Sequence, residues 1–233
     1  MQNKKEVGIG SAGRQFRVSK LRIGSYKILI NYEKDLEDTV PLLKKGLLQG
    51  SKLLKTGNDI VVIASSTDDE FIKSKMSGVT GFTPNAYSMF LRIDCESDWS
   101  RFIVGTILHE FNHVIRFQRT NFPRRPSVLD NLVMEGLAQC FEEDATGTLR
   151  PWSEAITREK AREIWQNIKD RLELKSRDLN DRIFIREGDE EFPLWAGYTM
   201  GYLMVRNKLK KLKKTNWDKL IGMNPKSFLE NGL

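Results

Sequence analysis

The chain has 233 residues, of which 39% are hydrophobic and 30% are charged, and this composition excludes a wholly disordered protein. No apolar run reaches the roughly 18 residues that a membrane-spanning helix needs, and residues 1–20 contain no apolar block of the kind found in secretory signals. Two cysteines are too few for a disulfide framework, so we expect a cytoplasmic protein.

The net charge of +7 is concentrated in two stretches of the chain. Residues 1–22 and residues 206–219 are strongly basic, and the rest of the chain is mildly acidic. The first stretch has scattered glycines and little to bury, which predicts a loosely ordered basic arm over residues 1–22. Because no zinc-finger spacing or RNA-binding aromatic motif accompanies these charges, we expect no specific nucleic-acid binding.

Residues 23–97 have the patterns of a small mixed sheet. Three short runs rich in branched and aromatic residues indicate strands, and a helical repeat of apolar residues lies between the first two. The predicted elements are a strand at 26–32, a helix at 36–55 with Pro41 in its first turn, a strand at 59–65, a helical turn at 68–75 and a strand at 86–94.

The pattern after residue 97 is predominantly helical. Four helices are predicted near 98–118, 127–143, 153–173 and 193–213, and no long linker separates them from the sheet. The sequence therefore predicts an α+β fold in which residues 23–233 form a single domain. Its sheet lobe would cover about 23–118 and its mostly helical lobe about 119–233.

The two histidines of the protein, His109 and His113, stand four residues apart in the sequence HEFNH. On an α-helix four residues make about one turn, so both imidazoles project from one face and can bind one metal ion such as zinc. Glu110 lies beside them, where a carboxylate can take a proton from water. Two histidines hydrogen-bonded within a core are the alternative, but that arrangement requires no Glu at this position.

The helix that carries HEFNH should be central and buried. Ser97 is a plausible amino-terminal cap, and Ile103, Ile107 and Phe111 belong to an apolar stripe at helical spacing. Histidines in so apolar a helix need a partner, which favours a bound metal.

A catalytic zinc site usually has three protein ligands, and no third histidine remains in this chain. A carboxylate from the next predicted helix is the natural candidate. Glu135 and Glu142 lie on one face of that helix, and Glu135 is preferred. Asp130 is a further rival, but it stands three residues after Ser127 and is better explained as the acid of a capping box.

The sequence HEFNH, followed downstream by Glu135-Gly-Leu-Ala (EGLA), resembles the gluzincin metallopeptidases. The sequence WAGYTMGY at 195–202 narrows the resemblance to the YjaZ-like bacterial family of predicted zinc-dependent proteases. The resemblance implies a zincin-like fold, with the active-site helix on a small mixed sheet. It also implies that His109, His113 and Glu135 bind zinc, that Glu110 is the general base, and that the strand at 86–94 is the edge strand that pairs with an extended substrate.

One position departs from the gluzincin pattern. Many gluzincins have an acid four residues after the ligand Glu, where it orients the first histidine, and this chain has Gln139 there. Asn112 or Asp130 is the candidate for that orienting role.

The predicted function is a zinc-dependent hydrolase of peptide bonds, with a peptide or protein as substrate. The oxyanion that forms during hydrolysis needs a hydrogen-bond donor besides the metal, and no spare histidine exists. Tyr198 and Tyr202 offer the available hydroxyl groups, and Tyr198 is preferred.

Two other functions remain open. A metal-dependent amidase of the peptide deformylase type would take an upstream cysteine as its third ligand, and Cys95 is available. A non-catalytic, zinc-stabilised binding protein would hold the metal with protein atoms only and contact its partners through the basic tails.

Overall fold

The structure is a computed structural model that describes residues 8–9, 14–231 and 233. The chain divides into two compact units, Met1–Gln118 and Arg119–Leu233. All described strands belong to the first unit, and the described secondary structure of the second is helical. The predicted α+β class, a mixed sheet followed by helices, is confirmed.

Six strands within the described residues form one mixed sheet in the order β1-β2-β3-β4-β6-β5. Strands β3, β4 and β6 are parallel to one another, whereas β1, β2 and β5 run antiparallel to their neighbours. The strands are β1 (Gly8–Ile9), β2 (Gln15–Ile23), β3 (Tyr26–Glu33), β4 (Ile60–Ser66), β5 (Val79–Asn85) and β6 (Ser88–Ile93).

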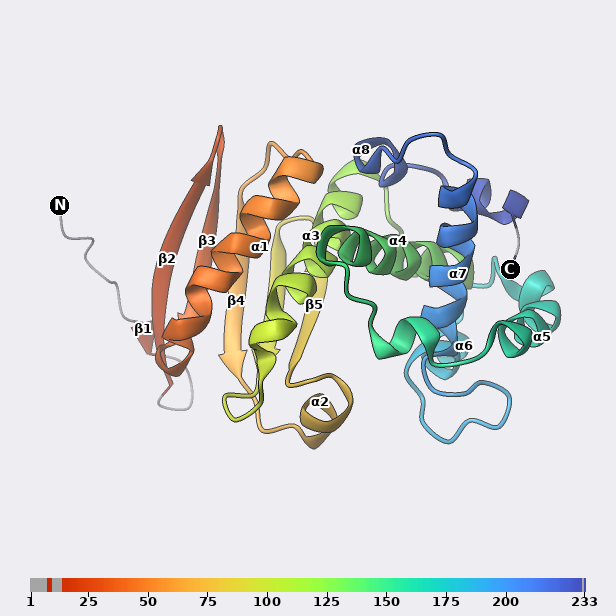
Figure 1. Ribbon diagram of the computed structural model, residues 1–233, viewed down its shortest axis with the longest axis horizontal. Coiled ribbons are helices and arrows are strands. Elements are labelled where there is room, and N and C mark those ends of the chain that lie inside the picture. Colours follow the sequence, from red (N-terminus) through yellow and green to blue (C-terminus); the bar gives the residue numbers. More distant parts are fainter. Residues whose placement is uncertain (1–7, 10–13, 232) are drawn as a thin grey trace. The chain divides into compact units, whose positions relative to one another are not determined.

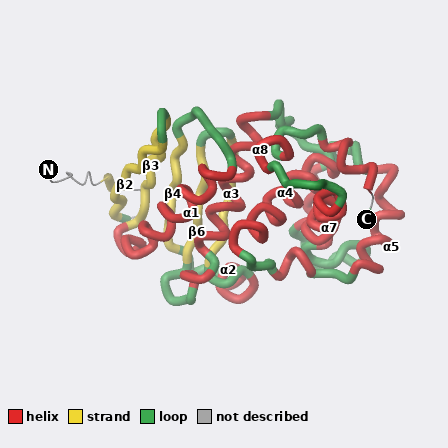
Figure 2. Tube along the Cα trace, turned by 45° about the horizontal axis from the view of Figure 1, so that its top comes forward, coloured by secondary structure: helices red, strands yellow, loops and turns green. Residues whose placement is uncertain are grey.

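Two helices of the first unit, α1 (Val40–Leu53) and α3 (Ile103–Arg119), lie over the same face of the sheet (Figures 1 and 2). They pack closely, since a Cβ placed on Gly46 of α1 would lie 2.8 Å from Cγ2 of Ile107 on α3. Alternate residues of the central strands, such as Ile28 and Ile30 of β3, are fully buried, as a sheet with one covered face requires. The shorter elements here are η1 (Lys34–Thr39), α2 (Glu70–Lys75) and η2 (Trp99–Arg101).

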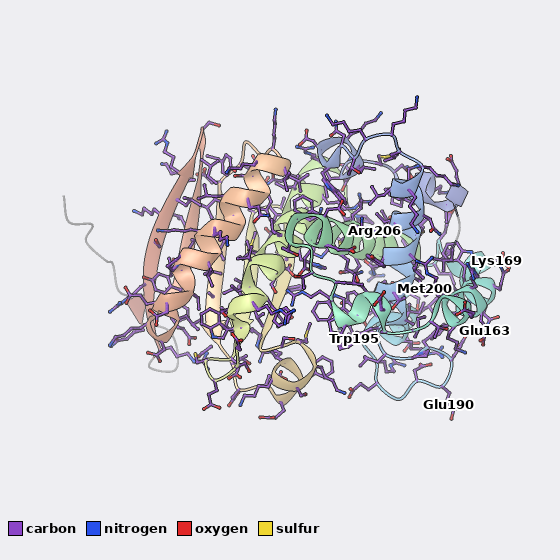
Figure 3. All side chains as sticks on the ribbon, viewed as in Figure 1. Glu163, Lys169, Glu190, Trp195, Met200 and Arg206 are labelled. Atoms are coloured by element: carbon purple, nitrogen blue, oxygen red, sulfur yellow. The ribbon has the colours of Figure 1, made fainter. Side chains whose placement is uncertain are left out.

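The second unit is built around two helices, α4 (Val128–Thr146) and α7 (Ala196–Lys210), which cross in close contact. A Cβ on Gly136 would lie 2.1 Å from the carbonyl oxygen of Gly201, so only glycine permits this approach. Further along α7, Arg206 (labelled in Figure 3) forms a 2.7 Å ion pair with Asp144 of α4. The remaining helices are α5 (Arg158–Ile168), α6 (Arg177–Phe184) and α8 (Trp217–Leu220).

None of the helices in the described part of the chain combines the length and the hydropathy that crossing a lipid bilayer requires.

The predicted loose arm is wrong for residues 15–22, which form most of β2, while residues 1–7 and 10–13 lie outside the described residues. A two-residue turn joins β2 to β3, with Ile23 paired to Tyr26 and Gly24 at a φ of +57°. No side chain of β2 is fully buried. Because the strand presents no buried face, its sequence lacks the alternation that identifies strands.

The predicted edge strand is also wrong. The strand predicted at 86–94 is β6, and it lies between β4 and β5. The edge position belongs to β5, which the sequence pattern did not predict because Gly81 and Pro84 interrupt its apolar residues. A proline within a strand is itself typical of an edge, where one side of the backbone needs no hydrogen-bond partner.

The predicted start of the HEFNH helix is wrong by five residues. Helix α3 begins at Ile103, and the short 3₁₀ turn η2 precedes it. The hydroxyl of Ser97 donates a hydrogen bond to the carboxylate of Asp94 and does not cap α3.

Candidate active site

Helix α3 places the two imidazoles one turn apart on its buried side, as their spacing predicts. The ring centroids of His109 and His113 are 4.7 Å apart, with ring planes at 86° to each other. Donor atoms of His109, Glu110 and His113 all lie within 4.8 Å of one another. Among the residues that the structure describes, this is the one such group of three metal-binding side chains.

The carboxylate of Glu110 lies against the edge strand β5. The hydroxyl of Thr83 donates a 2.7 Å hydrogen bond to Oε2 of Glu110, and both residues are buried. Gly81 lies under the same side chain, since a Cβ there would be 2.3 Å from Cγ of Glu110. The sequence pattern points to neither Thr83 nor Gly81, because it does not predict β5.

The second unit carries the three candidate carboxylates on α4, and two of them have structural partners. The carboxylate of Asp130 accepts hydrogen bonds from the backbone N–H and the hydroxyl of Ser127, which confirms the predicted capping box. Glu142 forms an ion pair with Arg150, and both side chains are only 2% exposed. Glu135 is half-buried. Asp130 and Glu142 therefore both have structural roles within the second unit.

Gln139 is also occupied within the second unit. Its amide nitrogen donates hydrogen bonds to the carbonyl oxygens of Tyr198 (3.0 Å) and Glu135 (3.2 Å), and its amide oxygen accepts one from the hydroxyl of Ser153 (2.7 Å). The side chain therefore connects α4, α7 and the turn η3 (Pro151–Glu154). This use explains why an amide is found where many gluzincins have an acid.

The two tyrosines of α7 have different surroundings. The hydroxyl of Tyr202 donates a 2.8 Å hydrogen bond to Glu143. Burial is the larger cause and this hydrogen bond the second cause that raise the pKa of Tyr202 to about 12. Tyr198 is half-buried, and its ring packs edge-to-face against Phe184 at a centroid distance of 5.3 Å. Tyr202 is therefore engaged within the second unit, by its hydrogen bond to Glu143.

Asn112, one of the two residues predicted to orient a histidine, makes no hydrogen bond to either imidazole. Its side chain is fully buried, and neither amide atom has a hydrogen-bond partner in the described part of the chain. Of the two candidates for orienting a histidine, Asn112 therefore does not do so in this structure.

Comparisons with known proteins identify the family of this chain. Residues 45–230 match a family model described as Predicted Zn-dependent protease (DUF2268). The chain belongs to this family. The family resemblance predicted from HEFNH, EGLA and WAGYTMGY is thereby confirmed, and zinc is the metal of the family. No curated protein matches the chain.

Solved structures of other proteins are similar to this chain. An aminopeptidase N family protein from Idiomarina loihiensis is similar with a TM-score of 0.51 and 11% identity, over 93% of this chain and 41% of that one. A two-domain M1 zinc metallopeptidase solved with L-tryptophan gives a TM-score of 0.43 and 14% identity, over 94% and 45% of the two chains. The chain spans less than half the length of either protein. At 11% identity the first likeness shows the zincin-like fold alone.

The donor set on α3 fits the zinc that the family takes. Two imidazole nitrogens one helical turn apart are donors that zinc binds in catalytic sites, and the Glu110 carboxylate lies beside them. Cys95, the ligand required by the deformylase alternative, is exposed and outside this group. Desolvation, with smaller contributions from the charges of Asp35 and Asp94, raises the pKa of its thiol.

Proposed function

We propose that this protein is a zinc-dependent peptidase in which His109, His113 and Glu135 hold the metal and Glu110 is the general base. The observation that carries the proposal is the convergence of the His109, Glu110 and His113 donor atoms within 4.8 Å on one buried helix. The assignment of Glu135 is supported by the capping role of Asp130 and by the ion pair of Glu142 with Arg150. Membership of a family of predicted zinc-dependent proteases supports the peptide substrate.

When bound, zinc supplies a Lewis acid that polarises a carbonyl group and makes water a nucleophile at neutral pH. The protein contributes the proton transfers. Glu110 accepts a proton from the attacking water as the new C–O bond forms, and it delivers that proton to the amine nitrogen as the C–N bond breaks. The carboxylate is thereby regenerated, so each turnover consumes one water and one peptide bond.

The hydroxyl of Tyr198 is the proposed donor to the oxyanion. A donor at this position stabilises negative charge that develops only in the transition state, so it should affect turnover more than binding. The engagement of Tyr202 with Glu143 supports the choice of Tyr198.

The deciding experiment combines elemental analysis of the purified full chain with digestion of a peptide library. We expect stoichiometric zinc in the wild type and in Glu110→Gln, and a loss of cleavage by at least about 100-fold in Glu110→Gln alone. Glu70→Gln is the matched control, because Glu70 is on the same unit with a side chain that is 85% exposed. Undiminished cleavage in Glu110→Gln would contradict the proposal and leave the non-catalytic alternative.

The zinc content of two variants distinguishes the proposed peptidase from the deformylase alternative. The proposal expects Glu135→Ala to lose zinc and Cys95→Ala to retain it. The opposite result, zinc lost in Cys95→Ala and kept in Glu135→Ala, would assign the third ligand to Cys95 and favour the amidase.

A further inference from the structure

The Glu110 side chain is held by a residue that neither the HEFNH sequence nor the family match identifies. Thr83 lies on β5, 27 residues earlier in the chain, and its hydroxyl is 2.7 Å from Oε2 of Glu110 and 3.2 Å from the Glu110 main-chain oxygen. Thr83 is 7% exposed and Glu110 is 4% exposed, so water competes little for this contact.

Gly81 provides the space in which the carboxylate lies. A Cβ at this position would be 2.3 Å from Cγ, 2.6 Å from Cδ and 2.5 Å from Oε1 of Glu110, and each distance is shorter than atoms can approach. Gly81 and Thr83 are two residues apart on a strand, so they face the same side of the sheet. Gly81 leaves room for the carboxylate of Glu110, and Thr83 donates a hydrogen bond to it.

This arrangement matters because a glutamate side chain has three rotatable bonds and an unrestrained carboxylate samples many positions. A general base acts only when its oxygen is within hydrogen-bond reach of the proton that it takes. If the carboxylate is fixed before substrate binds, its conformational freedom no longer has to be lost during the reaction. Fixing it has little effect on how tightly substrate binds.

We propose that Thr83 is the positioning residue for Glu110, with Gly81 providing the space that the positioned carboxylate occupies. The proposal rests on the proposed function, in which Glu110 is the general base. Thr83 touches neither substrate nor metal in this role, and it acts through its hydrogen bond to Glu110.

The test compares three substitutions on β5 in the full zinc-loaded chain. Thr83→Val keeps the shape of the side chain and removes the hydroxyl, Thr83→Ser keeps the hydroxyl, and Thr80→Val is the control, since Thr80 faces the other side of the strand. We expect Thr83→Val to lower kcat by about 10- to 100-fold with little change in KM or zinc content. Thr83→Ser should recover most of the lost kcat, and Thr80→Val should match the wild type.

A second measurement does not depend on activity. Urea unfolding midpoints at saturating zinc are measured for Thr83→Val, Glu110→Ala and the double variant. If the two side chains are bonded, Thr83→Val lowers the midpoint when Glu110 is present and has little further effect in the Glu110→Ala background. Shifts that simply add would show that the bond does not form in solution and would overturn the inference.

The outcomes separate this inference from the function on which it rests. If Glu110→Gln loses cleavage while Thr83→Val keeps the wild-type kcat, the function stands and the positioning role of Thr83 is overturned. If Glu110→Gln still cleaves peptides, the proposed function is overturned, and the positioning role with it. Loss of kcat in Thr83→Val, recovered by Thr83→Ser with unchanged KM, supports both.

Discussion

Buried polar side chains have different uses in the two units of this protein. In the first unit several of them, including His109 and Glu110, lie on α3, and Glu110 accepts a hydrogen bond from Thr83 of the edge strand. In the second unit they form pairs within the helical structure, as Glu142 does with Arg150 and as Gln139 does with Ser153. The first arrangement is suited to chemistry, and the second holds helices in place.

This difference predicts how substitutions should behave. Changes to the polar side chains of α3 should alter zinc binding and turnover. Changes to the polar pairs of the second unit should mainly lower the free energy of unfolding, except at Glu135 and Tyr198, which the proposed function assigns to the site. The expected effects range from loss of zinc binding to a small change in the pH dependence of stability.

The largest effect is expected for His113→Ala. Because even the loss of a residue that supports a metal ligand weakens binding by about 10- to 100-fold, loss of a ligand should lower zinc affinity further and abolish cleavage. Chelator competition and elemental analysis measure this. Glu135→Ala in the second unit should behave in the same way, and Glu163→Ala is its control, because the Glu163 side chain on α5 is 61% exposed. Full zinc retention in Glu135→Ala would remove Glu135 from the ligand set.

The next effect concerns stability alone. Arg150→Met leaves the buried carboxylate of Glu142 without its cation, which should lower the free energy of unfolding by about 3–5 kcal/mol. Methionine retains an unbranched apolar side chain near Trp152, over whose ring the Arg150 guanidinium lies. The double variant Glu142→Leu, Arg150→Met should recover most of the loss. Urea unfolding measures both. A single variant as stable as the wild type would show that this pair does not stabilise the second unit.

Tyr198→Phe tests whether α7 contributes to the chemistry. Loss of an oxyanion donor should lower kcat by roughly 100-fold without loss of zinc. Tyr202→Phe, one turn further along α7, removes the hydrogen bond to Glu143 and should lower stability with little change in kcat. An unchanged kcat in Tyr198→Phe would confine the second unit to metal binding and structure.

The smallest effect is a pH dependence in the second unit. A hydrogen bond from Arg182, assisted by backbone N–H groups of Glu191 and Phe192, lowers the pKa of Asp189 to about 2. Because this folded-state pKa lies below the ordinary value of 3.8 for an aspartate, the stability contributed by Asp189 is present above pH 4 and is lost as the pH falls towards 2. Asp189→Asn should flatten the stability profile in that window. The same slope in both proteins would contradict the assignment to Asp189.

The features of this chain that can be predicted from sequence are those set by residues close together in the chain. The HEFNH helix is predictable because a four-residue spacing and an apolar stripe are local features of one element. The capping box of Ser127 and Asp130 is local in the same sense. The parallel strands β3, β4 and β6 are predictable because their buried faces give runs of apolar residues.

The features that the sequence does not predict depend mainly on contacts between residues far apart in the chain. Strand β5 is stabilised by pairing with β6, and its own residues, interrupted by Gly81 and Pro84, do not show an alternation. The partnership of Thr83 with Glu110 could not be predicted without that strand. Helix α6 is difficult to predict because it spans only eight residues, about two turns, although Leu179 and Ile183 give it a buried apolar face.

The hydrogen bonds of Gln139 limit what this position can become. A carboxylate has no hydrogen to give to the carbonyl oxygens of Tyr198 and Glu135, so an acid here would face two acceptors unless it took up a proton. Acquiring the acid found in many gluzincins would therefore require compensating changes along α7 and η3. The amide of Gln139 is thus tied to the packing of α4 against α7 and η3.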